Sequence, residues 1–148
     1  MSALFMIVAA ILLLGPLIAI HEFGHYWVAR KLGVKVLVYS IGFGPTLLKW
    51  QSKKSGIQYQ LSALPLGGYV KMLDEREGDV ATHDLPFAFN RQPLWARAAI
   101  VLAGPMANLF LAVFLYSSTF WIGQYETSPI MAAPVVGSIA EDAGLRSG

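Results

Sequence analysis

The chain has 148 residues, of which 55% are hydrophobic and 14% are charged, whereas about 25% are charged in an ordinary soluble domain. This composition predicts a membrane protein. Eleven Lys and Arg against nine Asp and Glu leave a net charge of +2, too small and mixed to indicate a nucleic-acid-binding protein. The absence of cysteine excludes disulfides, iron–sulfur clusters and thiol nucleophiles, so any metal must be held by His and carboxylate side chains.

The first predicted element is a transmembrane helix over residues 1–31. Residues 3–20 carry no charge and, at about 1.5 Å of rise per residue, nearly match a hydrocarbon core of about 30 Å. The run lacks the basic start and the small-residue cleavage site of a signal peptide, so we expect a retained anchor. Gly15 and Pro16 either kink this helix and open a path for water, or reflect how common both residues are in membrane helices.

A second apolar segment, residues 98–124, predicts another transmembrane helix, and residues 86–97 predict an interfacial approach to it. Of the 11 Lys and Arg residues, only Arg146 lies outside residues 30–97. The positive-inside rule therefore places the connection between the spans in the cytoplasm and both ends of this chain on the other side.

The connection over residues 32–85 predicts a small antiparallel β-sheet on the cytoplasmic side. Val34–Tyr39 and Ile57–Leu61 are rich in β-branched and aromatic residues, and turn-forming residues separate them. The segment Gly42–Pro45 has apolar neighbours on both sides, which suits a hairpin tip that touches or enters the bilayer. The polar stretch that follows the sheet includes His83, which we expect in water.

The segment His21-Glu22-Phe23-Gly24-His25 ends the first span and matches the pattern H-E-x-x-H. Positions four apart on a helix differ by about 400°, so His21 and His25 leave the same face and could ligate one tetrahedral metal ion. Glu22 is offset by about 100°, which would let it act as a general base on a metal-bound water. A structural or snorkelling role is the alternative, but a carboxylate this close to a membrane favours a function.

Two positions of the second span have roles that the sequence leaves open. Gly104 predicts close packing between helices, because a small residue lets two backbones approach. Asn108 is a polar side chain where lipid offers no partner, so it either makes an interhelical hydrogen bond or lines the predicted site.

These features resemble the site-2 protease family of intramembrane zinc metalloproteases, and most closely its bacterial RseP branch. Further segments occur in the family's order, cover nearly the whole chain and are together far more specific than the H-E-x-x-H pattern alone. They are Ser40–Pro45, Pro65–Met72, Phe89–Asn90 and Ala103–Asn108.

The resemblance implies an integral membrane, multi-pass α-helical protein with a membrane re-entrant β-hairpin that includes Gly42–Pro45. It implies that His21 and His25 bind Zn²⁺ and that Glu22 activates the hydrolytic water. It also implies a bacterial inner-membrane location, with both ends of the chain in the periplasm. The implied substrates are single-span membrane proteins such as anti-sigma factors. The candidate substrate-binding residues are Gly42, Phe43, Gly44, Tyr69 and Asn108.

The predicted zinc site is incomplete in this chain. Catalytic zinc takes three protein ligands, and the sequence offers two. In the family the third is an Asp in a later membrane helix, in a motif ending Leu-Asp-Gly, which does not occur in residues 1–148.

Residues 125–148 predict an external linker and the truncated start of a PDZ-like domain, carried by the segment 134–148. We therefore expect a fragment that is inactive without the C-terminal half of the same protein. One alternative is a non-catalytic membrane module that binds transmembrane peptides by strand addition. Another, a soluble metalloprotease with a buried motif helix, is disfavoured by the apolar first span.

Overall fold

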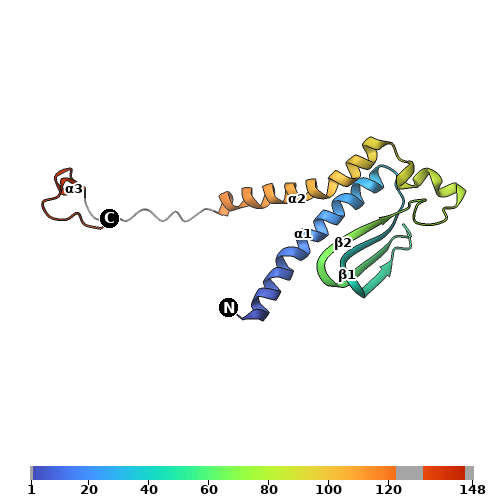
Figure 1. The fold of residues 1–148 in the computed structure, drawn as a ribbon, viewed down its shortest axis with the longest axis horizontal. Helices are drawn as coiled ribbons and strands as arrows, with labels where there is room; N and C mark the ends of the chain where they lie inside the picture. The colour runs from blue at the N-terminus through green and yellow to red at the C-terminus, as the bar shows by residue number, and fades with distance from the viewer. Residues whose placement is uncertain (1, 123–131, 146–148) are drawn as a thin grey trace. The chain divides into compact units, whose positions relative to one another are not determined.

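The computed structural model describes residues 2–122 and 132–145 (Figure 1). The chain forms two compact units, one ending at Phe114 and one beginning at Leu115. In chain order the elements are helix α1 (Ala3–Lys31), strands β1 (Val36–Gln51) and β2 (Gln58–Met72), 3₁₀ helices η1 (Thr82–Phe87) and η2 (Phe89–Arg91), and helices α2 (Leu94–Ile122) and α3 (Ile139–Asp142).

Helix α1 covers the segment predicted as the first span. It begins after Ser2, whose hydroxyl accepts a hydrogen bond from the backbone N–H of Phe5. The helix then runs for 29 residues and continues through Pro16. Gly33 follows its end with a φ of +81°, a left-handed conformation that favours glycine and turns the chain towards the sheet.

Helix α2 begins at Leu94, ahead of the apolar segment predicted at residues 98–124. The carbonyl of Pro93 accepts hydrogen bonds from the N–H groups of Ala96 and Arg97. Helical hydrogen bonding therefore starts before the side chains become uniformly apolar. For this reason the start predicted from polarity, residue 98, lies after the first residue of the helix.

Both long helices have the length and composition to cross a membrane. In their most apolar windows, 0% of the residues of α1 and 11% of those of α2 are buried inside the protein. Their large apolar side chains are therefore exposed, and lipid is the surrounding that suits such a surface.

Strands β1 and β2 form an antiparallel two-stranded sheet, and both are longer than the sequence predicts. The segment Gly42–Pro45, predicted as a hairpin tip, lies within β1, and the chain reverses at residues 52–57 instead. Gly42 and Gly44 have φ values of +89° and +82°, and the pairing shifts register on both sides of them. These glycines bend β1 without ending it. The residues just before the bend, 38–41, each pair with two residues of β2, one on either side.

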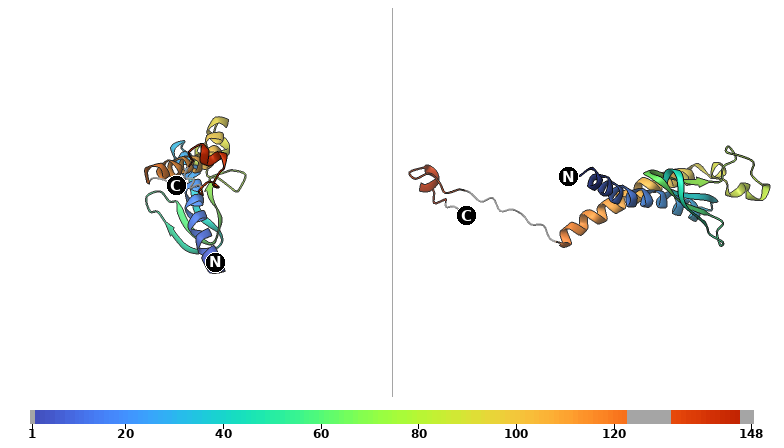
Figure 2. Two further views of the ribbon diagram at one scale, coloured as in Figure 1. Left: turned by 90° about the vertical axis from the view of Figure 1, so that its left-hand side faces the viewer. Right: turned by 90° about the horizontal axis from the view of Figure 1, so that it is seen from below.

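Helix α1 lies alongside the sheet in all three views (Figures 1 and 2). The hydroxyl of Tyr39 in β1 donates a 2.8 Å hydrogen bond to the carbonyl of Ala19 in α1. The hydroxyls of Tyr26 and Tyr59 lie 2.9 Å apart and join α1 to β2. A buried apolar cluster completes the contact, and it consists of Ala29, Val34, Val36, Ile57 and Ile100.

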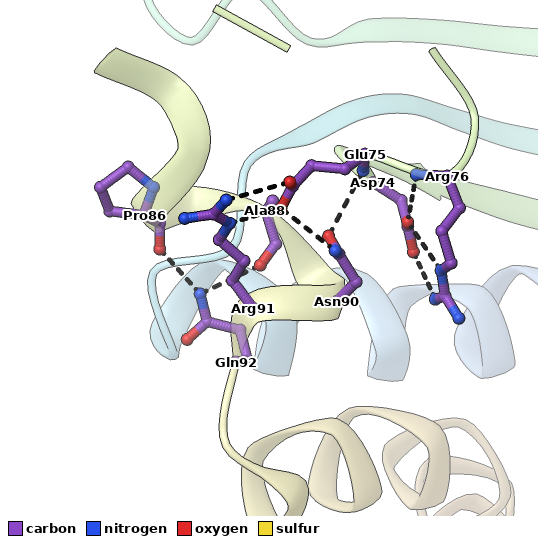
Figure 3. A network of polar contacts seen from close by, with 8 residues as sticks. All are labelled: Asp74, Glu75, Arg76, Pro86, Ala88, Asn90, Arg91 and Gln92. Carbon is purple, nitrogen blue, oxygen red and sulfur yellow. Dashed lines mark hydrogen bonds and ion pairs between the residues drawn. The ribbon is translucent and has the colours of Figure 1, made fainter. Parts of the chain in front are cut away.

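The loop between β2 and α2 is held by polar side chains (Figure 3). Glu75 accepts hydrogen bonds from the guanidinium of Arg91 and, at 3.1 Å, from the amide of Asn90. Asp74 accepts from Arg76 at 2.6 and 2.9 Å, and this bonding lowers the pKa of Asp74 to about 2. The loop therefore has defined contacts that connect its first residues to those just before α2.

The prediction for His83 is confirmed, because its side chain is 81% exposed. Its neighbour Asp84 forms a 2.7 Å ion pair with Lys35, just before β1. This pair connects η1 to the start of the sheet.

The unit that begins at Leu115 contains the end of α2 and the short helix α3. The hydroxyl of Ser138 caps α3 by accepting a hydrogen bond from the N–H of Glu141. This helix falls within the segment that resembles a PDZ opening. Residues 123–131, which include the end of the predicted second span and part of the predicted linker, and residues 146–148 lie outside the described residues.

Candidate metal centre

His21 and His25 lie one turn apart on α1, with their Nε2 atoms 3.2 Å from each other. The ring centroids are 4.9 Å apart and the ring planes meet at 81°. Two nitrogens bound to one tetrahedral zinc ion at about 2.0–2.1 Å would be separated by about 3.4 Å. The pair therefore has the spacing that a shared zinc ion needs.

The orientation of His25 is set by the backbone of α2. The Nδ1 atom of His25 lies 2.7 Å from the carbonyl oxygen of Ile100. A carbonyl oxygen can only accept, so Nδ1 carries the proton and Nε2 keeps its lone pair. This is the state in which an imidazole binds a metal through Nε2.

Two glycines let α1 and α2 approach closely at this point. A Cβ atom added to Gly24 would collide with the carbonyl oxygen of Ala103. One added to Gly104 would collide with Nε2 of His25 and lie 2.8 Å from Nε2 of His21. The absence of a side chain at Gly104 therefore leaves free the space that both Nε2 atoms face, which fits a bound ion.

Glu22 packs against the sheet. Its side chain is only 9% exposed, and a Cβ atom on Gly68 of β2 would lie 2.8 Å from its Cγ atom. Glu22 and His21 line a common cavity of about 310 Å³. The other lining residues come from α1, from the two strands and from α2, and they are Leu17, Ile18, Phe43, Gly67, Gly68 and Asn108.

A second cavity, of about 340 Å³, is lined by His25 and extends to the polar loop. Its wall includes Lys71, Asp74 and Glu77, together with Ile100 of α2. His21 thus lines a cavity next to the sheet, and His25 lines a cavity next to the charged loop.

The structure brings only some of the predicted substrate-binding residues to the candidate site. Phe43 and Asn108 line the cavity that Glu22 occupies. Tyr69 does not line this cavity; it stacks on Phe43, with ring centroids 6.4 Å apart and planes at 9°. Gly42 and Gly44 form the bend of β1 that presents Phe43.

Asn108 also answers a question that the sequence leaves open. Its side-chain amide lies 3.2 Å from Nδ1 of His21, across the gap between α2 and α1. Because Asn108 lines the cavity as well, the two roles that the sequence offers for it are compatible.

The predicted close approach of the helices at Gly104 is confirmed, but sequence reasoning did not place this glycine against the two histidine nitrogens. It also missed the carbonyl of Ile100 and the contact of Gly68 with Glu22. Ile100, Gly104 and Asn108 have the helical spacing i, i+4, i+8, and this is the signal that could have grouped them. The contact at Gly68 has no local signal, because it depends on how the sheet meets α1.

Within residues 2–122 and 132–145, no group of three or more His, Cys, Asp or Glu side chains is arranged to hold a metal ion. A catalytic zinc ion takes three protein ligands, and the described residues offer His21 and His25 as candidates for two of them.

The chain has close relatives among known proteins. It is 48% identical over 141 residues to a Vibrio cholerae protein provisionally named zinc metalloprotease. The aligned region covers 95% of this chain and 31% of that relative. It is 45% identical over 148 residues to the regulator of sigma-E protease RseP of Salmonella typhimurium. That aligned region covers 100% of this chain and 33% of the relative. The chain thus spans about a third of the length of these relatives.

The sequence profile of Peptidase family M50 matches residues 9–141. That match includes the two histidines, Glu22 and every residue that lines the cavity around it. The chain belongs to peptidase family M50, the site-2 protease family.

Proposed function

We propose that this chain is the N-terminal part of a zinc-dependent intramembrane endopeptidase, with His21 and His25 as zinc ligands and Glu22 as the general base. The main support is that the Nε2 atoms of His21 and His25 lie 3.2 Å apart, and that His21 and Glu22 line the same cavity. Relatives named as zinc metalloproteases support zinc as the metal. The third ligand comes from a part of the protein beyond residues 1–148.

Zinc, when bound, would polarise the scissile carbonyl and make a water molecule more acidic. Glu22 accepts a proton from the attacking water and returns it to the nitrogen of the leaving amine. Its position suits this role, because the carboxylate lies off the ligand face of α1 and inside the cavity that His21 borders. The carbonyl of Ile100 keeps His25 in the tautomer that leaves Nε2 available.

The hydrolytic water reaches this site from the side of the charged loop. The cavity that extends from His25 reaches the charged side chains of Lys71, Asp74 and Glu77, whereas the cavity beside Phe43 contains, among the described residues, no charged residue except Glu22 and the neighbouring histidine. Separate approaches for water and for an apolar substrate suit hydrolysis within a membrane.

The substrate is a single-span membrane protein whose helix unwinds before cleavage. A peptide bond inside a helix is shielded, so the segment to be cut must become extended, and a strand can then pair with it. Gly67 and Gly68 of β2 lie at the cavity with Glu22, which places backbone without bulky side chains next to the base. One relative is named a regulator of sigma-E protease, which makes anti-sigma factors the first substrates to test.

The protein is a multi-pass protein of the bacterial inner membrane, with the sheet on the cytoplasmic side and both ends of this chain in the periplasm. Leu47 and Leu48, beyond the bend of β1, have side chains 63% and 59% exposed, which supports a hairpin that re-enters the bilayer. Residues 134–148 begin a PDZ domain.

The test is cleavage of a single-span membrane protein by the full-length protein in detergent or liposomes. Glu22→Gln keeps the shape of the side chain but removes the base, so kcat should fall by about 10²–10⁴-fold or more while zinc stays bound. Glu141→Gln, on the exposed helix α3, is the matched control and should cleave normally. Cleavage by Glu22→Gln at the wild-type rate would contradict the proposal.

A second candidate function is binding of transmembrane peptides by strand addition, without hydrolysis. It is favoured for residues 1–148 in isolation, because the described residues offer two histidine ligands and no complete metal group. Recovery of intact substrate bound to a zinc-loaded full-length protein would favour this candidate.

A further inference from the structure

One face of α2 runs along the two histidines. Ile100, Gly104 and Asn108 follow one another at intervals of four residues, so they form a stripe on that face. The carbonyl of Ile100 meets Nδ1 of His25 at 2.7 Å, and the amide of Asn108 meets Nδ1 of His21 at 3.2 Å. Gly104 lies between them, against both Nε2 atoms.

The amide of Asn108 has its nitrogen turned towards Nδ1 of His21. In this orientation its oxygen, Oδ1, is buried and has no hydrogen-bond partner among the described residues. Rotation of the amide by half a turn exchanges the two atoms, which have nearly the same size and shape. Oδ1 would then accept a hydrogen bond from Nδ1–H of His21, and the NH₂ group would take the buried position that the oxygen leaves.

We propose that Asn108 is a positioning residue that holds His21 with its proton on Nδ1 and the lone pair of Nε2 directed at the shared metal position. Together with the carbonyl of Ile100, it makes α2 the helix that orients both zinc ligands of α1. The inference rests on the proposed function, since it assigns a role in zinc binding.

The chemistry of the pair supports this arrangement. When both histidines carry their proton on Nδ1, two lone pairs face each other across 3.2 Å, and a cation between them turns that repulsion into attraction. Outer partners of this kind on metal-binding histidines fix the tautomer and the ring orientation. A substitution that removes only the acceptor should therefore weaken zinc binding without touching a ligand.

The experiment compares zinc affinity in the full-length protein, measured in detergent by competition with a chromophoric chelator. Asn108→Leu keeps the branching and the number of heavy atoms but has no acceptor or donor, and we expect its zinc affinity to fall by about 10–100-fold. Asn108→Asp keeps an oxygen acceptor and should stay within about threefold of wild type. Met106→Leu, a nearby substitution at a more exposed position of α2, is the control and should bind zinc normally.

A second measurement separates positioning from packing. Nitrogen-15 NMR of the metal-free full-length protein, with the His21 signal assigned from a His21→Gln variant, reports which ring nitrogen carries the proton. We expect a larger fraction of the Nδ1–H tautomer in wild type and Asn108→Asp than in Asn108→Leu, because only the first two offer Nδ1–H an acceptor. Unchanged zinc affinity and tautomer in Asn108→Leu would overturn the inference, as would equal losses in the Leu and Asp variants.

Zinc affinity and the tautomer of His21 together distinguish failure of the proposed function from failure of the role proposed for Asn108. If the wild-type protein takes up no zinc, the proposed function fails, whatever the tautomer of His21. If the wild-type protein binds zinc but the Nδ1–H fraction of its His21 is no larger than in Asn108→Leu, the role of Asn108 fails and the proposed function stands.

Discussion

Gly104 is the residue whose lack of a side chain leaves room for the two histidine nitrogens. A methyl group there would collide with Nε2 of His25 and crowd Nε2 of His21. We expect Gly104→Ala to lower zinc affinity at least about tenfold and to lower the free energy of unfolding by about 1–3 kcal/mol. Chelator competition and thermal unfolding of the full-length protein would measure the two effects.

Gly15→Ala is the matched control, because Gly15 is also a helical glycine but has nothing within 4 Å of a Cβ position. This change should be neutral or slightly stabilising, since alanine favours helix. Wild-type zinc affinity in Gly104→Ala would contradict the account of the space between the helices.

At the level of single residues, sequence predicts the candidate site in part. The spacing of His21 and His25 is a property of one helix, so their common face follows from local geometry. The carbonyl of Ile100 belongs to a different helix, and a backbone group has no residue identity that could mark it. Its role therefore appears only once α1 and α2 are placed together.

The loop between β2 and α2 depends on the bonds from Glu75 to Arg91 and Asn90 (Figure 3). Glu75→Gln or Arg91→Gln should loosen the loop, and we expect amide hydrogen exchange over residues 73–92 to rise by about two- to fivefold. The double variant Glu75→Arg/Arg91→Glu restores opposite charges and should recover part of the protection. Exchange that stays slow in both single variants would show that the loop is held in another way.

The stabilisation of the loop by Glu75 should depend on pH, and the direction of that dependence follows from the pKa of Glu75. The bonds from Arg91 and Asn90 hold the pKa of Glu75 below its usual value. A carboxyl group whose pKa is lower in the folded state stabilises that state above its unfolded pKa, and the contribution disappears as pH falls through the folded pKa. Protection of the loop should therefore decrease in acid in the wild-type protein and change less in Glu75→Gln.

For the elements, the sequence predicts the helices better than the strands. Long apolar runs mark α1 and α2 clearly, although Leu94 begins α2 earlier than polarity suggests. Gly42–Pro45 has the residues of a turn but lies within β1, because pairing with β2 continues past the two glycines. Whether a glycine bends a strand or ends it depends on its partner strand, which the local sequence does not specify.

For the molecule as a whole, charge predicts an orientation that can be measured. We expect Lys54→Cys, in the turn between β1 and β2, to react with a membrane-impermeant maleimide only after the inner membrane is opened. Val136→Cys, with a side chain 87% exposed, should react from the periplasmic side in intact spheroplasts. This chain has no cysteine of its own, so each introduced thiol reports one position when the rest of the protein is also free of cysteine. The reverse labelling pattern would place the sheet outside the cell.

Anomalous scattering at the zinc absorption edge, from crystals of the full-length protein, would locate the bound metal. We expect a peak at about 2.0–2.1 Å from Nε2 of both His21 and His25, with a third ligand from beyond residues 1–148. The absence of zinc, or a zinc ion bound without either histidine, would contradict the proposed metal centre.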